Sequence, residues 1–288
     1  MLLFCGTMKL FKTVILILCL TLADCLALFA GTVDTLNIIS ESMRKEVKCI
    51  VILPENYSSV TNRFPVLYLL HGYSGNYSSW LKLDPGLPEK VDKLNMIIVC
   101  PDGGYGSWYI DSPIDSTMKY ETHIVEEIIP FIDMNYRTID RKDQRAITGL
   151  SMGGHGGLYL AARHTDVFGA AGSSSGGVDI RQYTESWELK ERILGDTICC
   201  KQNWEDHTVI NVIEKLENNQ LKLIIDCGID DFFLDVNRKL HEKLLKNGID
   251  HDYTERPGKH NSEYWLNSID YHLLFFEKFF NSSTIGKQ

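Results

Sequence analysis

The chain has 288 residues, of which 38 are acidic and 29 are basic, so its formal net charge is −9 at pH 7. This negative charge excludes a nucleic-acid-binding role, because such proteins need a basic surface to displace counterions. Hydrophobic residues make up 44% of the chain and charged residues 23%, which is the composition of an ordinary globular protein. A chain of this length can bury one large core without dividing into several domains.

The first thirty residues differ in composition from the rest of the chain. Lys9 and Lys12 precede the apolar run TVILILCLTLADCLALFA, and small residues lie near its end. A short basic region followed by a short apolar core is typical of a secretory signal peptide. We therefore expect a signal peptide over residues 1–30 and an exported domain, periplasmic or secreted, over residues 31–288.

Asp24 interrupts the apolar run and leaves it too short for a stable membrane span. The small residues Ala27 and Ala30 are the expected cleavage positions. The sequence LADC faintly resembles a lipoprotein box ending at Cys25, but an aspartate directly before the cysteine disfavours lipid attachment there.

Five cysteines follow the expected signal peptide. Cys49, Cys100 and Cys227 lie in apolar runs, where a free cysteine behaves as a small buried hydrophobic residue. Cys199 and Cys200 are adjacent, a spacing that fits neither a zinc site nor a disulfide framework, and their role stays open. We therefore predict no metal site.

Apolar runs ended by turn residues alternate along the chain with segments of helical periodicity. The predicted strands cover residues 36–40, 47–54, 64–70, 96–102, 145–150, 170–176, 221–228 and 252–257. The predicted helices cover 120–136, with a kink expected at Pro130, and 156–164, 233–248 and 263–280. Residues 178–207 show no clear period. This alternation predicts an α/β fold with a mostly parallel sheet and helices on both faces, and active sites in such folds lie at the carboxyl ends of the strands.

The sequence Gly149-Leu150-Ser151-Met152-Gly153 lies where a predicted strand meets a predicted helix. It fits the pattern G-x-S-x-G of a nucleophile elbow, whose sharp turn requires small residues two positions before and after the serine. The alternative is a polar residue on an ordinary glycine-rich turn. The position in mid-chain, between strand and helix, favours Ser151 as a nucleophile.

A serine hydroxyl needs a base to accept its proton and an acid to orient that base, and on this fold the three follow in the order Ser, Asp or Glu, His. Asp231 and Asp230 both follow the strand that contains Asp226, and we favour Asp231; a helix cap is the alternative role for either. His260 lies on a glycine-containing loop between the last predicted strand and the last helix. It is the histidine in the right position for the base.

Catalysis of acyl transfer also needs two N–H groups that bind the developing oxyanion. The amide that follows the nucleophile, Met152 N–H, is one expected donor. The second comes from the loop after an earlier strand, here HGYSGN, and Tyr73 N–H is the expected donor. A simple polar loop is the alternative interpretation of this stretch.

Taken together, these motifs resemble the esterase D family of α/β-hydrolases, which includes tributyrin, feruloyl and acetylxylan esterases, S-formylglutathione hydrolase and the mycolyltransferases. The resemblance covers about residues 33–280 and is strongest to small secreted bacterial tributyrin-type esterases. It is carried by YLLHGYSGNYSSW, GSWYIDSP, KYETHIVEEIIPFIDMNYRT, ITGLSMGGHGGLYLA, DCGIDDFF and RPGKHNSEYW.

The resemblance implies an α/β-hydrolase fold with Ser151, Asp231 and His260 as the triad. Asp231 aligns because it directly precedes the phenylalanine of the family's acid loop. It also implies Tyr73 and Met152 as oxyanion donors. Residues 178–220 match the family least and are expected to be an insertion that shapes substrate access.

Three aromatic residues, Trp80, Trp108 and Tyr109, are expected to line the substrate cleft, although aromatic residues in such positions also serve as core.

The predicted function is that of a serine carboxylesterase that hydrolyses short-chain or carbohydrate-linked acyl esters without metal or cofactor. One alternative is acyl transfer by the same triad. Another is a non-catalytic, exported carbohydrate-binding protein on a hydrolase fold.

Overall fold

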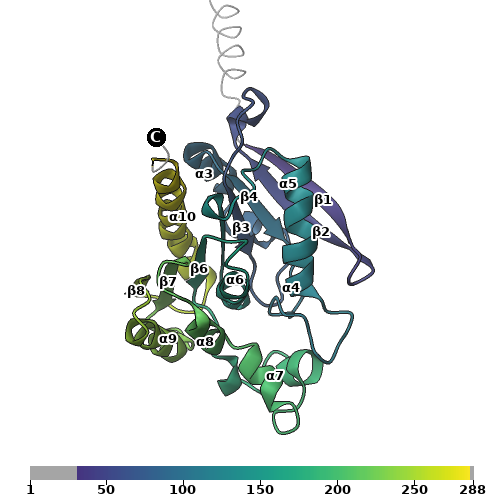
Figure 1. Cartoon of the computed structure of the whole chain (residues 1–288), viewed down its shortest axis with the longest axis vertical. Coiled ribbons are helices and arrows are strands. Elements are labelled where there is room, and N and C mark those ends of the chain that lie inside the picture. The colour runs from purple at the N-terminus through teal and green to yellow at the C-terminus, as the bar shows by residue number, and fades with distance from the viewer. Residues whose placement is uncertain (1–30, 286–288) are drawn as a thin grey trace, which may run out of the picture. The chain divides into compact units, whose positions relative to one another are not determined.

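One sheet of eight strands forms the centre of the computed structural model, which describes residues 31–285 (Figure 1). The strands are β1 (Thr32–Ser40), β2 (Lys45–Leu53), β3 (Val66–Leu70), β4 (Ile97–Pro101), β5 (Arg145–Gly149), β6 (Ala170–Ser174), β7 (Lys222–Gly228) and β8 (Asp252–Arg256). They lie in the order β1-β2-β4-β3-β5-β6-β7-β8. β2 is antiparallel to both of its neighbours, β1 and β4, and all pairings from β4 to β8 are parallel.

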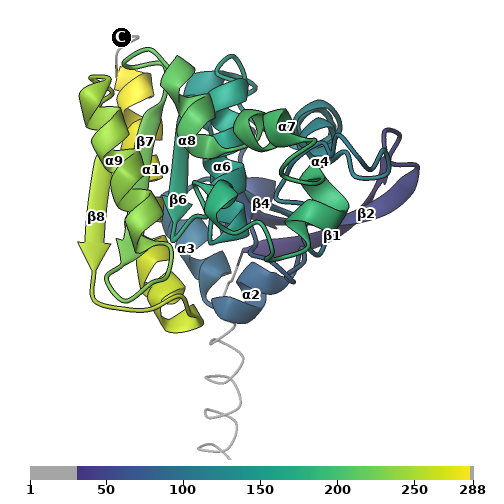
Figure 2. The same ribbon diagram turned by 90° about the horizontal axis from the view of Figure 1, so that it is seen from below.

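Helices cover both faces of this sheet, as Figure 1 and Figure 2 show. Those packed on the sheet include α2 (Ser79–Leu83), α3 (Leu87–Leu94), α5 (Ile129–Asn135), α6 (Met152–Arg163), α9 (Leu234–Lys246) and α10 (Ser262–Ile285). In β3, Tyr68 and Leu70 belong to the core under α5, α6 and α9, whereas Leu67 and Leu69 belong to the core under α2, α3 and α10. Alternate residues of a strand point to opposite faces, so a strand buried on both sides is apolar throughout.

Each predicted strand overlaps an observed strand, and the expected mostly parallel sheet with helices on both faces is confirmed. The predicted helix over 120–136 is divided. A short α4 (Tyr120–Thr122) leads into a π-helical stretch, His123–Ile128, before α5 begins. Pro130 lies directly after this π-helical stretch, within continuous helical backbone, since Ile128 and Ile129 before it are both in the right-handed helical region. The wider π-helical turn is where the chain accommodates a residue that has no N–H to donate.

The 178–220 segment, which lacks a clear sequence period, consists of short helical pieces. They are a 3₁₀ turn (Ile180–Gln182), a π-helical stretch (Leu189–Leu194), α7 (Lys201–Asp206), α8 (Val209–Val212) and a second 3₁₀ turn (Ile213–Lys215). Pieces of one or two turns are too short to show a hydrophobic repeat, so periodicity could not predict them.

By its internal contacts, Gly31–Gln288 forms one compact unit. Within residues 31–285, no helix is long and apolar enough to cross a membrane. The predicted signal peptide over residues 1–30, and Cys25 within it, lie outside the described residues.

Candidate active site

Three side chains from separate loops meet at the carboxyl edge of the sheet. Ser151 follows β5, Asp231 follows β7 and His260 follows β8, each within a few residues of the strand end. The imidazole Nε2 of His260 lies 2.9 Å from Ser151 Oγ, and its Nδ1 lies 2.8 Å from Asp231 Oδ2. In this arrangement the imidazole can accept the hydroxyl proton while the carboxylate holds the ring in the required tautomer.

Ser151 sits on a strained turn between β5 and α6. Its φ is +54°, a region that residues other than glycine seldom adopt. A Cβ on Gly149 would lie 2.6 Å from the backbone of Gly153, and a Cβ on Gly153 would lie 2.5 Å from Leu70 O. Both glycines are therefore needed for the elbow to form, as the pattern predicts.

The structure distinguishes the two carboxylates that follow β7. The side chain of Asp231 is fully buried, and its Oδ1 accepts a hydrogen bond of 2.8 Å from Phe233 N–H while Oδ2 faces the imidazole. Asp230 is exposed, and its backbone N–H donates a hydrogen bond to Gly258 O. Asp231 is thus the residue in contact with His260.

The two predicted oxyanion donors lie next to the serine. Met152 is the first residue of α6, and Tyr73 lies in the loop after β3. That loop passes directly beside the nucleophile, since a Cβ on Gly72 would lie 3.5 Å from Ser151 Cβ. The neighbouring amides of Ser151 and Gly153 donate to backbone carbonyls, whereas within residues 31–285 neither Met152 N–H nor Tyr73 N–H is paired with an acceptor. Both remain available to a bound oxyanion.

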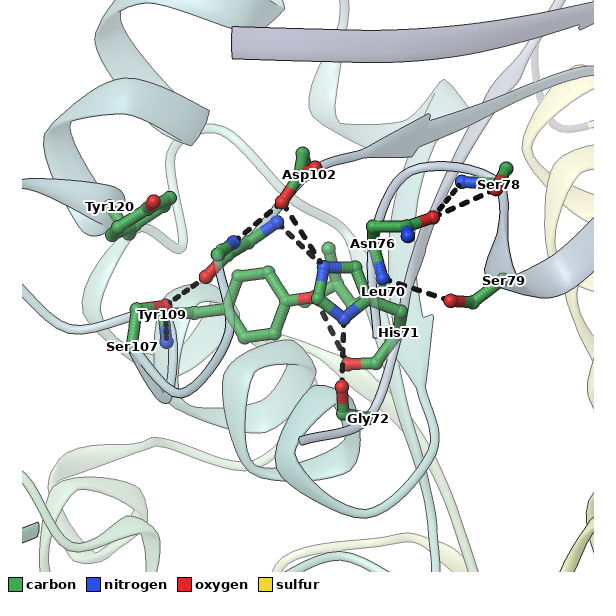
Figure 3. Close-up of polar contacts among 12 residues, drawn as sticks. Leu70, His71, Gly72, Asn76, Ser78, Ser79, Asp102, Ser107, Tyr109 and Tyr120 are labelled. Atoms are coloured by element: carbon green, nitrogen blue, oxygen red, sulfur yellow. Dashed lines mark hydrogen bonds and ion pairs between the residues drawn. The ribbon is translucent and has the colours of Figure 1, made fainter. Parts of the chain in front are cut away.

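A buried histidine fixes the shape of the Tyr73 loop (Figure 3). His71 Nε2 accepts a 2.8 Å hydrogen bond from Gly103 N–H, so Nδ1 carries the proton and donates to Gly72 O, also at 2.8 Å. The hydroxyl of Tyr109 donates to His71 O. No sequence motif marks His71 for this role, and its position directly after a buried strand is the available signal.

A pocket of about 360 Å³ opens beside Ser151 and His260. Part of its wall is aromatic and consists of Tyr73, Trp80, Trp187, Phe232 and Trp265. Trp187 comes from the 178–220 segment, and its ring stacks on that of Phe232 with centroids 6.2 Å apart. Trp187 and Trp265 were not predicted to line the pocket, because no sequence motif marks either residue for that role. The motif around Phe232 identified only the preceding acid, Asp231, and not Phe232 itself as a pocket residue.

Most of the chain matches a known family of esterases. Residues 40–276 match the protein-family model described as "Putative esterase". The chain belongs to this esterase family.

Its relatives agree with the assignment. An esterase of Mycobacterium tuberculosis is 32% identical over 236 residues, which are 73% of this chain and 51% of the relative. The acetyl esterase of Caldicellulosiruptor saccharolyticus is 28% identical over 248 residues, which are 80% of this chain and 92% of that enzyme. This esterase-family chain spans about half the length of the M. tuberculosis relative.

A solved structure of a ferulic acid esterase superimposes with a TM-score of 0.75 at 27% identity, covering 88% of this chain and 99% of that one. The family predicted from the motifs and the α/β-hydrolase fold are therefore confirmed.

Of the three aromatic residues expected in the cleft of this esterase-family chain, Trp80 is a pocket-lining residue. The side chains of Trp108 and Tyr109 are 1% and 0% exposed and lie in the core instead. Trp108 packs behind the wall, with its ring 5.4 Å from that of Trp187. Both residues have positive φ, and neither lines the pocket.

A buried carboxylate supports the elbow from behind. Asp226 in β7 accepts hydrogen bonds from Tyr264 OH, Ser174 Oγ and His272 Nε2, and it pairs with Arg256 at 2.8 Å. Burial alone raises the pKa of Asp226, but the hydrogen bond from His272 and the charges of His272 and Arg256 outweigh burial and lower it. The backbone carbonyl of Ser174 also accepts a hydrogen bond from Ser151 N–H. The network therefore joins α10 and β8 to the strand beside the nucleophile.

Within residues 31–285, no group of three or more potential metal ligands is present.

Proposed function

We propose that this chain is a serine carboxylesterase that hydrolyses small-molecule acyl esters through an acyl-enzyme intermediate. The observation that carries the proposal is the continuous hydrogen-bonded chain from Ser151 through His260 to Asp231, at the mouth of an aromatic pocket. The esterase family and the acetyl and ferulic acid esterases among its relatives support the reaction class.

The reaction follows from the geometry. His260 Nε2 accepts the proton of Ser151 as Oγ attacks the ester carbonyl, and the amides of Met152 and Tyr73 bind the oxyanion. His260 then gives the proton to the leaving alcohol. Water hydrolyses the acyl-enzyme by the same steps, and Asp231 keeps the imidazole in the tautomer that presents Nε2 to the serine.

Two finer features belong to the same proposal. The aromatic wall, which includes Trp187 and Phe232, suits esters with a flat or carbohydrate-linked group, because such groups stack on aromatic rings. The basic and apolar pattern of residues 1–30 supports export. Export is tested by determining the N-terminus of the protein recovered outside the cytoplasm; a start at residue 1 would contradict cleavage.

The test of the reaction is Ser151→Ala, assayed on p-nitrophenyl acetate and butyrate and on methyl ferulate. We expect kcat to fall about 10⁶-fold, since the members of a triad act as a unit. Wild-type protein should also bind a fluorophosphonate probe covalently, and the variant should not. Hydrolysis that survives the substitution would overturn the proposal, and inertness of the wild type toward every ester would favour the carbohydrate-binding alternative.

Acyl transfer uses the same residues and differs only in the acceptor. Adding a primary alcohol to the assay separates the two reactions. For a hydrolase, free acid remains the main product, whereas a transferase yields mainly the new ester.

A further inference from the structure

Cys199 and Cys200 have no place in the proposed reaction, yet their thiols lie together. Their Sγ atoms are 3.3 Å apart. Cys199 is exposed and Cys200 is partly exposed, whereas the three other cysteines within residues 31–285, Cys49, Cys100 and Cys227, are buried. This pair is therefore the part of the described chain where thiol chemistry is open to small reagents.

The backbone of a tight turn brings the two thiols together. Cys200 N–H donates to Asp196 O at 2.9 Å, and Ile198 N–H donates to Asp196 Oδ1 at 2.8 Å. Cys200 Sγ packs against Gly195, where a Cβ would come within 2.8 Å of the sulfur. The turn joins the Leu189–Leu194 stretch to α7, so it lies in the segment that carries Trp187 of the pocket wall.

We propose that Cys199 and Cys200 form a redox modification site, which closes as a disulfide between adjacent residues. The oxidant is a small-molecule disulfide such as oxidised glutathione. One cysteine thiolate attacks it and releases the first reduced glutathione, and the second cysteine thiolate attacks the mixed disulfide and releases the other. The two electrons of the cysteine pair reduce the oxidant, and the two thiol protons pass to the released thiolates.

The bond closes under strain and is therefore reversible. The Cα atoms of adjacent residues are about 3.8 Å apart across a trans peptide, which is shorter than the span of about 4.4–6.8 Å that disulfides usually bridge. Strained and exposed disulfides are the ones that reducing agents open most easily. We infer a labile bond rather than a permanent crosslink.

The experiment equilibrates the full chain in buffers with graded ratios of reduced to oxidised glutathione, then alkylates free thiols and digests the protein with trypsin. Cleavage after Arg192 and Lys201 releases Ile193–Lys201, which contains both cysteines and no other. As the buffer becomes more oxidising, we expect this peptide to change from doubly alkylated to unalkylated and lighter than the free dithiol by two hydrogen atoms. Added reductant should restore the dithiol.

Cys199→Ser is the matched control, since it keeps one thiol at the same turn. It should yield a glutathione adduct and no internal bond. A wild-type peptide that stays doubly alkylated at every ratio would overturn the site, as would glutathione adducts or chain-to-chain links in place of the internal bond. This readout is independent of ester hydrolysis, so it stands or falls separately from the proposed function.

Discussion

The triad loops and the 178–220 segment both face the pocket, but they are built in different ways. Ser151, Asp231 and His260 follow β5, β7 and β8, which are parallel strands of one sheet with β6 between β5 and β7, so the hydrogen-bonded sheet determines their separations. Trp187 comes from short helical pieces outside the sheet, at a point where it and Glu188 have φ of +54° and +55°. The comparison indicates that the sheet positions the reacting atoms, whereas the 178–220 segment shapes the wall that contacts the rest of the substrate.

The largest effect tests the first half of this comparison. Asp231→Asn should lower kcat about 10⁴-fold, because an amide no longer holds His260 in the tautomer that can accept the serine proton. Asp230→Asn is the matched control one residue away, and it should leave kcat within about twofold of wild type because Asp230 is exposed and does not contact the base. Steady-state hydrolysis of p-nitrophenyl acetate measures both. Equal losses in the two variants would contradict the assignment of the acid.

A smaller effect on stability is expected behind the elbow. Asp226→Asn should lower the free energy of unfolding by about 3–5 kcal/mol at pH 7, since it removes the buried counter-charge of Arg256 and the carboxylate that contacts His272. Urea denaturation gives the value. The exposed Asp252→Asn is the control, with a change expected within about 0.5 kcal/mol. Similar values for the two variants would show that the network contributes nothing to stability.

The pH dependence of the same variant follows from the lowered pKa of Asp226. A lowered folded-state pKa stabilises the folded protein above the unfolded value of about 3.9, and this stabilisation disappears as the pH falls through the folded-state pKa. The stability difference between wild type and Asp226→Asn should therefore be constant near neutrality and shrink below about pH 4. Unfolding curves at several pH values test this, and a difference that grows on acidification would contradict it.

The smallest effect tests the second half of the comparison. Trp187→Ala should raise KM for methyl ferulate about 10-fold and change kcat little, because the lost stacking contact serves the substrate and the transition state equally. For p-nitrophenyl acetate the effect should be smaller. Ile198→Ala is the control in the same segment, since Ile198 is 90% exposed and does not line the pocket. A fall in kcat with unchanged KM would place Trp187 in the chemistry instead.

The same division explains what the sequence could predict. Most strands were predictable because burial on both faces demands apolar runs, and Ser151 was predictable because it follows such a run. His260 was predictable from its position after the acid, on the loop between the last strand and the last helix. Asp231 was favoured over Asp230 because it directly precedes Phe232, but only the folded chain shows that Asp231 is buried against His260 while Asp230 is exposed. Trp108 and Tyr109 could belong to cleft or core on composition alone, and only the packing of the folded chain places both in the core.

Trp187 shows why the rest of the site was not predictable. It lies in a segment with no hydrophobic repeat, and its place in the pocket depends on rings brought from distant parts of the chain, Phe232 among them. No pattern near residue 187 encodes that contact.

The crowding around Gly153 has a consequence for protein engineering. The carbonyl that a Gly153 side chain would strike belongs to Leu70, the last residue before the His71–Tyr73 loop. A mutation at the elbow would therefore displace the oxyanion loop as well as the nucleophile, so the two cannot be evolved independently. Directed-evolution libraries for new substrates are best concentrated around Trp187, which lines the pocket from a segment outside the sheet and outside the triad loops.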